Sequence, residues 1–160
     1  MPIEWLDGNL LESDCHVLIH QANCRGVMGA GIAAQIKQRW PSAYQADRDF
    51  HIPFGPDRLG HISHAIVRGL PDPLIIVNAY GQDRYGRGKQ TNEMALELAI
   101  HEALVRTKKL EEHLGMELKV GLPAGIGAGL GGGDPVLIRQ LLKRLATDHN
   151  RTLWLYDYRP

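Results

Sequence analysis

The sequence predicts an α/β fold, a three-layer sandwich in which helices cover both faces of a central sheet of about six strands. Short apolar runs typical of strands alternate along the chain with longer segments of helical periodicity. Two of the strand-to-helix connections are rich in glycine, at residues 26–31 and 125–133. A chain of 160 residues can bury one full core but is too short for two comfortable domains, so we expect a single domain over residues 1–160.

The first part of the chain contains two predicted strands and two predicted helices. Residues 3–6 are a short strand candidate that ends in turn residues, and residues 16–22 are apolar enough for a central strand. A helix is expected at about residues 29–39, because the proline at position 41 pushes the residue before it out of the α region. A second, short helix is expected through residues 44–49.

The middle of the chain contains two further strands and a long helix. Residues 61–67 alternate apolar and polar side chains, and residues 74–77 are continuously apolar, as in an interior strand. Residues 78–89 lack periodicity but are rich in hydrogen-bonding groups, so we interpret them as a site-forming loop at the carboxyl end of a strand. Thr91 is expected to cap a helix that ends near Gly115.

The last part of the chain repeats the order of strand, glycine loop and helix. Residues 118–123 are the next predicted strand, and they lead into the glycine-rich residues 125–133. Asp134 has the position of a helix cap, with Pro135 as the first helical residue. Residues 152–158 alternate in side-chain type and are expected to close the sheet.

Composition argues against several classes of protein. The 18 lysines and arginines balance 18 aspartates and glutamates, so no overall field gathers nucleic acid or an acidic membrane. The two cysteines are too few for a disulfide framework and indicate reduced thiols. No apolar run approaches the ~20 residues of a membrane span, and the N-terminus lacks a basic-then-apolar signal. We therefore expect a soluble, cytoplasmic protein with no membrane partner.

The stretch from His20 to Ala33 predicts a site for a phosphate-bearing small molecule. It contains a strand end, three glycines and the start of a helix. Glycine lets the backbone approach a ligand closely, and the N–H groups and dipole of a helix N-terminus favour an anion.

Two other nucleotide-binding classes fit this stretch less well. Residues 29–34 satisfy the loose dinucleotide pattern G-x-G-x-x-A, so a Rossmann oxidoreductase is an alternative. That fold requires a second strand about 20 residues later that ends in an acidic residue, and the interval holds Trp40-Pro41 and a polar helix instead. A P-loop kinase is also disfavoured, because neither glycine stretch ends in Gly-Lys-Ser or Gly-Lys-Thr.

Four segments, in order, resemble the macrodomain family, the ADP-ribose-binding fold. They are Gly8-Asn9-Leu10-Leu11, residues 20–33, the strand and loop from Asn78, and residues 122–130. The resemblance covers essentially the whole chain and implies a mixed sheet. The first loop is similar to the branch with Gly-Val-Met-Gly-x-Gly-Ile-Ala, which includes ADP-ribose-1''-phosphate phosphatases, terminal ADP-ribose glycohydrolases and a DNA de-ADP-ribosylating antitoxin.

The resemblance implies ligand contacts along the whole molecule. Asn9, beside Leu10, stands where many members place an aspartate that accepts from the adenine amino group, although a turn residue is an alternative. Tyr156 matches aromatics that pack on adenine, with a core or surface tyrosine as the alternative, and Asn23 matches the asparagine at the distal ribose. The phosphates are expected at the backbone of two loops, which comprise Gly29, Gly31, Ile32, Gly127, Ala128, Gly129 and Leu130.

The resemblance leaves the reaction more open than the ligand. In the lysine-dependent glycohydrolase branch, a lysine that attacks the distal ribose stands near the position of Gln82, which cannot form that adduct. Lys89 stands further along the same loop as an alternative. The stretch Asn-Ala-Tyr-Gly-Gln-x-x-Tyr-Gly is more similar to phosphatase-type members. We therefore expect an ADP-ribose-1''-phosphate phosphatase, with a glycohydrolase acting on protein or DNA and a non-catalytic ADP-ribose reader as alternatives.

The candidate catalytic residues are His20, Gln82 and Asp134. His20 can act as base or nucleophile because imidazole titrates near neutrality, but strand alternation also allows a packed structural histidine. Asp134 can act as an acid or base, or serve only as a helix cap. Groups expected to bind the distal ribose and its phosphate include Gln82, together with Asn78, Tyr85 and Arg87.

No metal or cofactor is expected. His61 and His64 lie at strand positions without helical pairing or acidic partners, so they do not indicate a metal site. The expected partner is ADP-ribose, or a small molecule or macromolecule that carries it, and nucleic acid enters only if it is ADP-ribosylated. A monomer is expected.

Overall fold

The computed structural model describes residues 2–159, so Met1 and Pro160 of the predicted domain lie outside the described residues. Its strands form one six-stranded sheet in the order β1-β6-β5-β2-β4-β3. The strands are β1 (Ile3–Asp7), β2 (Val17–Asn23), β3 (Ile62–Arg68), β4 (Leu74–Gln82), β5 (Val120–Pro123) and β6 (Leu153–Asp157). Only β3 runs antiparallel to its neighbour within the described chain, so the sheet is mixed, as expected.

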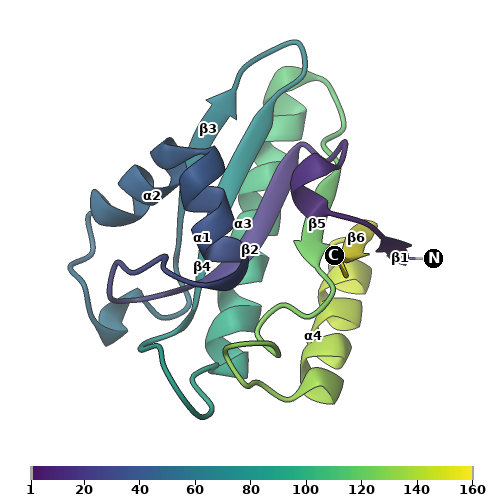
Figure 1. Cartoon of the computed structure of the whole chain (residues 1–160). Helices are drawn as coiled ribbons and strands as arrows, with labels where there is room; N and C mark the ends of the chain where they lie inside the picture. The colour runs from purple at the N-terminus through teal and green to yellow at the C-terminus, as the bar shows by residue number, and fades with distance from the viewer. Residues whose placement is uncertain (1, 160) are drawn as a thin grey trace.

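Helices cover both faces of this sheet (Figure 1). They are α1 (Gly31–Arg39), α2 (Pro41–Arg48), α3 (Glu93–Leu114) and α4 (Pro135–Asp148), with two 3-10 turns, η1 (Leu10–Glu12) and η2 (Pro56–Arg58). The larger apolar core lies between the sheet and α3 with α4, and a smaller one lies under α1 and α2. The three-layer α/β/α prediction is therefore confirmed.

Local sequence signals place most helix ends where they were expected. Pro41 occupies the first turn of α2, and α3 ends at Gly115 in the left-handed region with φ of 68°. Asp134 caps α4, because its carboxylate accepts from the backbone N–H groups of Val136 and Leu137 at 2.9 and 3.4 Å. The apolar stripes of the last two helices are buried, and comprise Leu96, Ile100, Ala103, Leu104, Ile138, Leu141, Leu142 and Leu145.

Two sequence predictions about the middle of the chain are wrong. Strand β4 continues to Gln82 rather than ending at position 77, because the polar side chains of Asn78 and Tyr80 find hydrogen-bond partners inside the protein. The cap of α3 is Asn92, whose side chain accepts from the Ala95 N–H at 3.0 Å. Thr91 instead bonds to a loop from another part of the chain, as described below.

The sheet divides at its carboxyl edge between β2 and β5. These two strands pair at only two positions, Val17 with Val120 and Leu18 with Gly121. Strand β2 then continues to Asn23 against β4 alone. The chain leaves β2 toward α1 on one side of this division and leaves β5 toward α4 on the other. In α/β sheets such a point, where connections go in opposite directions, forms a crevice for ligands.

A chain of buried hydrogen bonds holds α2 and η2 against β3 and β4. Tyr80 Oη donates to Asp47 Oδ1 at 2.6 Å, and Arg58 Nη1 donates to the same oxygen at 3.0 Å. Asn78 Nδ2 donates to Ser63 Oγ at 3.0 Å, and that hydroxyl lies 2.7 Å from Tyr80 Oη. The side chains of Asp47 and Arg58 are each 1% exposed, so this ion pair is fully desolvated.

In the described chain, no helix has both the length and the apolar character that crossing a membrane requires.

We predict that Asp47→Ala lowers the free energy of unfolding by about 3–5 kcal/mol, because it leaves the Arg58 guanidinium buried without its partner. Asp49→Ala is the matched control, since Asp49 is exposed and accepts only from Gln45 in the same helix region. Its effect should be about 0.5 kcal/mol or less. Urea unfolding measures both changes, and equal losses would show that the buried pair is not what fixes α2.

Candidate functional site

Three loops gather at the carboxyl edge of the sheet, in the lower half of Figure 1. The first glycine loop (24–30) follows β2, the β4 loop (83–91) follows β4, and the second glycine loop (124–134) follows β5. A Cβ built on Gly31, the first residue of α1, would lie 3.1 Å from Leu130 Cδ1, so the chain directly after the first glycine loop closely approaches the second. The two predicted loops therefore lie on either side of the division between β2 and β5.

Asn23 shapes the first glycine loop. Its Nδ2 donates to the Val27 carbonyl at 2.7 Å, and its Oδ1 accepts from the Arg25 and Val27 N–H groups at 3.0 and 3.4 Å. The helix α1 then begins at Gly31, and its cap residue, Ala30, supplies no side-chain hydrogen bond. The N–H groups of the first turn are therefore left for another acceptor, which is the arrangement that binds phosphate at helix N-termini.

The second glycine loop is held in shape from the β4 loop. The Gly127 carbonyl accepts from Thr91 Oγ1 at 2.6 Å and from the Gly133 N–H at 2.8 Å. The Gly131 carbonyl accepts from the N–H groups of Gln90 and Thr91 at 2.7 and 3.0 Å. Between these ties, Gly129 and Leu130 are exposed and Gly127 and Ala128 are half-buried. The hydrogen bonds at Gly127 and Gly131 thus hold both ends of this segment, and the predicted phosphate-binding residues Gly129 and Leu130 lie exposed between them.

His20 and Asn78 require a correction, because neither side chain reaches these loops. His20 is 1% exposed and Asn78 is fully buried. His20 Nε2 donates to Asn78 Oδ1 at 2.6 Å, while Asn78 Nδ2 donates to the Ala43 carbonyl and Ser63 Oγ. Burial lowers the pKa of His20 to about 4, so the ring is neutral near pH 7. This face of β2 is covered by α1 and α2, and the packed-histidine alternative fits the geometry.

The side chains of Asn9 and Asp134 both accept hydrogen bonds from nearby backbone N–H groups. Asn9 Oδ1 accepts from the Leu11 N–H at 3.0 Å and so caps η1. The side chain of Leu10, which follows it, is buried in the apolar cluster under α1 and α2. Asp134 caps α4, as described above. In both residues, the side-chain hydrogen bonds are those of a capping residue.

Gln82 and the exposed residues after it form the outer end of the site. Gln82 Nε2 donates to the Arg84 carbonyl at 2.7 Å, and Gln82 Oε1 accepts from Gln21 Nε2 at 2.6 Å. Tyr85 and Arg87 are both exposed in the β4 loop. Arg25 binds both carboxylate oxygens of Asp83, at 3.0 and 2.9 Å, and so ties the first glycine loop to the β4 loop.

Lys89 forms an ion pair within its own segment. Its Nζ lies 2.8 Å from Glu93 Oε2 in the first turn of α3. The same carboxylate oxygen accepts from the Asp134 N–H at 3.1 Å. This pairing holds the amine at the base of the β4 loop.

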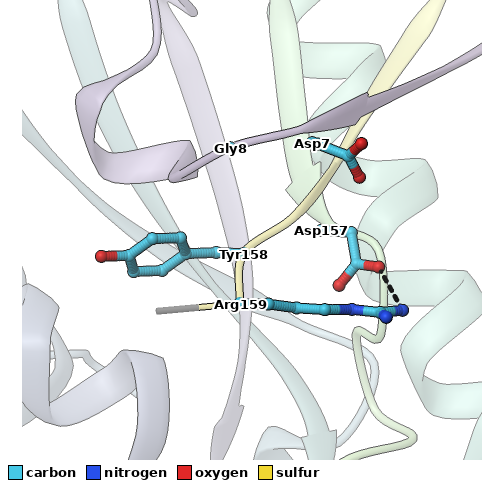
Figure 2. A pocket seen from close by; sticks show the side chains of 5 residues that line it. All are labelled: Asp7, Gly8, Asp157, Tyr158 and Arg159. Carbon is cyan, nitrogen blue, oxygen red and sulfur yellow. Dashed lines mark hydrogen bonds and ion pairs between the residues drawn. The ribbon is translucent and has the colours of Figure 1, made fainter.

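The sequence reasoning did not predict a cavity at the other end of this sheet edge. A cavity of about 560 Å³ lies at the carboxyl ends of β1 and β6, lined by Asp7, Gly8, Asp157, Tyr158 and Arg159 (Figure 2). Tyr158 is 49% exposed, and Figure 2 shows its ring pointing away from the Asp157–Arg159 ion pair. The predicted Tyr156 is half-buried, and its hydroxyl lies 3.8 Å from Cys15 Sγ. The sequence signal that could have indicated Tyr158 is its place as an aromatic residue directly after the last strand.

Across residues 2–159, no three or more histidine, cysteine, aspartate or glutamate side chains are grouped to hold a metal ion.

Comparison with known proteins assigns the fold. No family model matches the sequence. The macrodomain of Thermus aquaticus DarG superposes with a TM-score of 0.76 at 24% identity, and the match covers 99% of this chain and 98% of that chain. Thermosipho africanus DarTG, in complex with ADP-ribose, superposes with a TM-score of 0.73 at 17% identity over 98% of this chain and 41% of that chain. The protein therefore has the macrodomain fold, as the sequence resemblance implied.

A shorter match is closer in sequence. The DNA ADP-ribosyl glycohydrolase of Mycobacterium tuberculosis is 46% identical over 44 residues. This match spans 28% of this chain and only 12% of the curated relative's length.

We predict that neutral His20 makes the stability of the protein depend on pH. The unfolded chain takes up this proton near the ordinary pKa of 6.5, whereas the folded chain does so only near pH 4. The contribution of neutral His20 is therefore complete above pH 6.5 and is lost as the pH falls toward 4. The full loss is on the order of 3 kcal/mol in the free energy of unfolding.

Urea unfolding at about pH 7.5 and about pH 5 checks this effect in the wild type and in His20→Gln, which cannot titrate there. The variant should lose less stability between the two conditions. Equal losses in both proteins would contradict the assignment.

Proposed function

We propose that the protein binds ADP-ribose in the crevice between its two glycine loops and hydrolyses a substituent on the distal ribose. The observation that carries the proposal is the close approach of Gly31 and Leu130, which leaves little room for a Cβ at Gly31, at the point where β2 and β5 part. Backbone N–H groups on two facing loops suit the two phosphates of a diphosphate. The macrodomain fold, and the ADP-ribose complex of the Thermosipho africanus neighbour, support the same ligand.

The two ends of the crevice differ in chemistry, which gives the ligand a direction. The cavity beside Tyr158 offers an exposed aromatic ring for a base, together with acidic groups that accept from an amino group. The other end is formed by Asn23, Gln82 and the exposed Tyr85 and Arg87. Adenine therefore lies toward β1 and β6, and the distal ribose lies toward the β4 loop.

The β4 loop favours phosphate as the substituent that is removed from the distal ribose. Gln82 has no nucleophilic amine, and Lys89 is paired with Glu93. The exposed guanidinium of Arg87 suits a phosphate, to which it can donate two hydrogen bonds. Water then supplies the oxygen that bonds to phosphorus, the bond from phosphorus to the ribose oxygen breaks, and that oxygen takes up a proton as ADP-ribose leaves.

A second candidate is the removal of ADP-ribose from DNA. It is favoured by the 46% identity over 44 residues to a relative named DNA ADP-ribosyl glycohydrolase. In that reaction the bond from the distal ribose to the DNA breaks, and water replaces the DNA. The third candidate is a protein that binds ADP-ribose without turnover, and the assays below distinguish the three candidates.

We predict that Gly31→Ala weakens ADP-ribose binding by about tenfold. Gly31 has φ of 59°, where a side chain is strained, and the added methyl group would also push Leu130. Gly69→Ala is the control, because Gly69 lies outside the site and a Cβ there meets nothing within 4 Å. Isothermal titration with ADP-ribose, with AMP as the comparison ligand, measures the effect. Equal affinities in the two variants would remove the loop contact from the proposal.

We predict that the wild type releases inorganic phosphate from ADP-ribose-1''-phosphate, and that Lys89→Ala does so at a rate within about twofold. An amine nucleophile would instead make Lys89→Ala inactive. Release from an ADP-ribosylated oligonucleotide without phosphate release would establish the second candidate. Tight ADP-ribose binding without either reaction would establish the third candidate, a protein that binds ADP-ribose without turnover.

A further inference from the structure

The side chain of Gln21 joins three segments beneath the crevice. Gln21 lies on β2, on the opposite face of the sheet from His20. Its Nε2 donates to Gln82 Oε1 at 2.6 Å and to Thr91 Oγ1 at 2.8 Å. The Thr91 hydroxyl in turn donates to the Gly127 carbonyl at 2.6 Å. One carboxamide and one hydroxyl therefore connect β2, the end of β4 and the second glycine loop.

Two glycines leave the space that these side chains occupy. A Cβ at Gly81 would lie 2.3 Å from Gln21 Oε1, and one at Gly131 would lie 2.3 Å from Thr91 Oγ1 and 2.8 Å from Gln21 Nε2. Neither glycine has a positive φ, so backbone strain does not require glycine there. Gln21 and Thr91 make the closest approaches at these positions, with Leu96 Cβ at 3.0 Å from a Cβ at Gly81 and the Gly127 carbonyl at 2.9 Å from one at Gly131.

We propose that Gln21 and Thr91 are positioning residues with separable tasks. Gln21 fixes the carboxamide of Gln82 toward the distal ribose, and Thr91 fixes the wall of the phosphate site at Gly127. This inference rests on the proposed function, because it assigns the two tasks to the two ends of the ADP-ribose crevice. Neither Gln21 nor Thr91 is assigned a contact with the ligand.

The hydrogen bonds separate the two tasks. Without Gln21, the second glycine loop keeps the bond from Thr91 to the Gly127 carbonyl and the two N–H bonds to the Gly131 carbonyl. The Gln82 side chain then keeps only its bond to the Arg84 carbonyl, so its Oε1 atom is no longer held and the carboxamide is free to turn. Without the Thr91 hydroxyl, the Gly127 carbonyl loses a donor from the β4 loop, while Gln21 Nε2 loses one acceptor but keeps its bond to Gln82 Oε1. The first change acts on turnover, and the second acts on affinity.

Gln21→Met, Thr91→Val and Thr91→Ser test this assignment. Gln21→Met keeps a long side chain but removes the donor, and we expect kcat for ADP-ribose-1''-phosphate to fall about tenfold while Kd for ADP-ribose stays within threefold. Thr91→Val should weaken ADP-ribose binding about tenfold, and Thr91→Ser should restore it. Gln45→Met is the matched control, because it removes an exposed glutamine bond in α2. Unchanged kcat in Gln21→Met, or unchanged affinity in Thr91→Val, would overturn the assignment.

Hydrogen exchange followed by mass spectrometry gives a readout that needs no ligand. Gln21→Met should speed amide exchange in the β4 loop, and Thr91→Val should do so in the second glycine loop, while Gln45→Met changes neither. Unchanged exchange in the named loops overturns the inference even if the protein binds ADP-ribose. Absence of ADP-ribose binding by the wild type overturns the proposed function, and the exchange pattern still decides whether Gln21 and Thr91 position the loops.

Gly81→Ala offers an independent route to the same effect. Its methyl group would displace the Gln21 carboxamide without removing any hydrogen-bonding group, and its other near neighbour would be Leu96 Cβ at 3.0 Å. We expect Gly81→Ala to lower kcat about as much as Gln21→Met does. In a protein that already carries Gln21→Ala, we expect the further change Gly81→Ala to leave kcat unchanged. Additive losses in the double variant would show that Gly81 acts through something other than Gln21.

Discussion

The short pairing between β2 and β5 is the constraint on which the rest of the site depends. Parallel strands in one sheet normally continue their ladder, but these two share hydrogen-bonded register at only two positions. Beyond Leu18, β2 pairs with β4 alone. A crevice at this division needs walls whose backbone can come close, and the glycine-rich loops after β2 and β5 provide them.

The two faces of β2 carry polar side chains with different tasks. His20 lies on the face covered by α1 and α2, where its bond to Asn78 joins it to the buried hydrogen bonds that reach Asp47 and Arg58. Gln21 lies on the opposite face, where it holds the loops of the site. Adjacent residues in a strand point to opposite faces, so one step along the chain separates a side chain that stabilises the fold from one that shapes the site.

Electrostatics in this protein is local. The net charge is zero, yet Arg25 is paired with Asp83 at the crevice, and Lys89 with Glu93 behind it. The first pair joins two loops and the second lies within one segment, so both cations are already paired, whereas Arg87 is exposed in the β4 loop. The ends of the crevice accordingly differ, with acidic groups and Tyr158 at one end and hydrogen-bonding groups and a guanidinium at the other.

The sequence by itself determined the layers, nearly all of the elements and the two glycine loops, because periodicity, proline, glycine and capping residues act within a few positions along the chain. It did not determine which polar residues belong to the site. His20 resembles a catalytic group until α1 and α2 cover it, and Asp134 resembles one until its carboxylate is seen to cap α4. Gln21 meets partners 61 and 70 positions away, and only the tertiary structure could bring them together. Burial and long-range hydrogen bonds depend on the whole packed chain, and no local pattern encodes them.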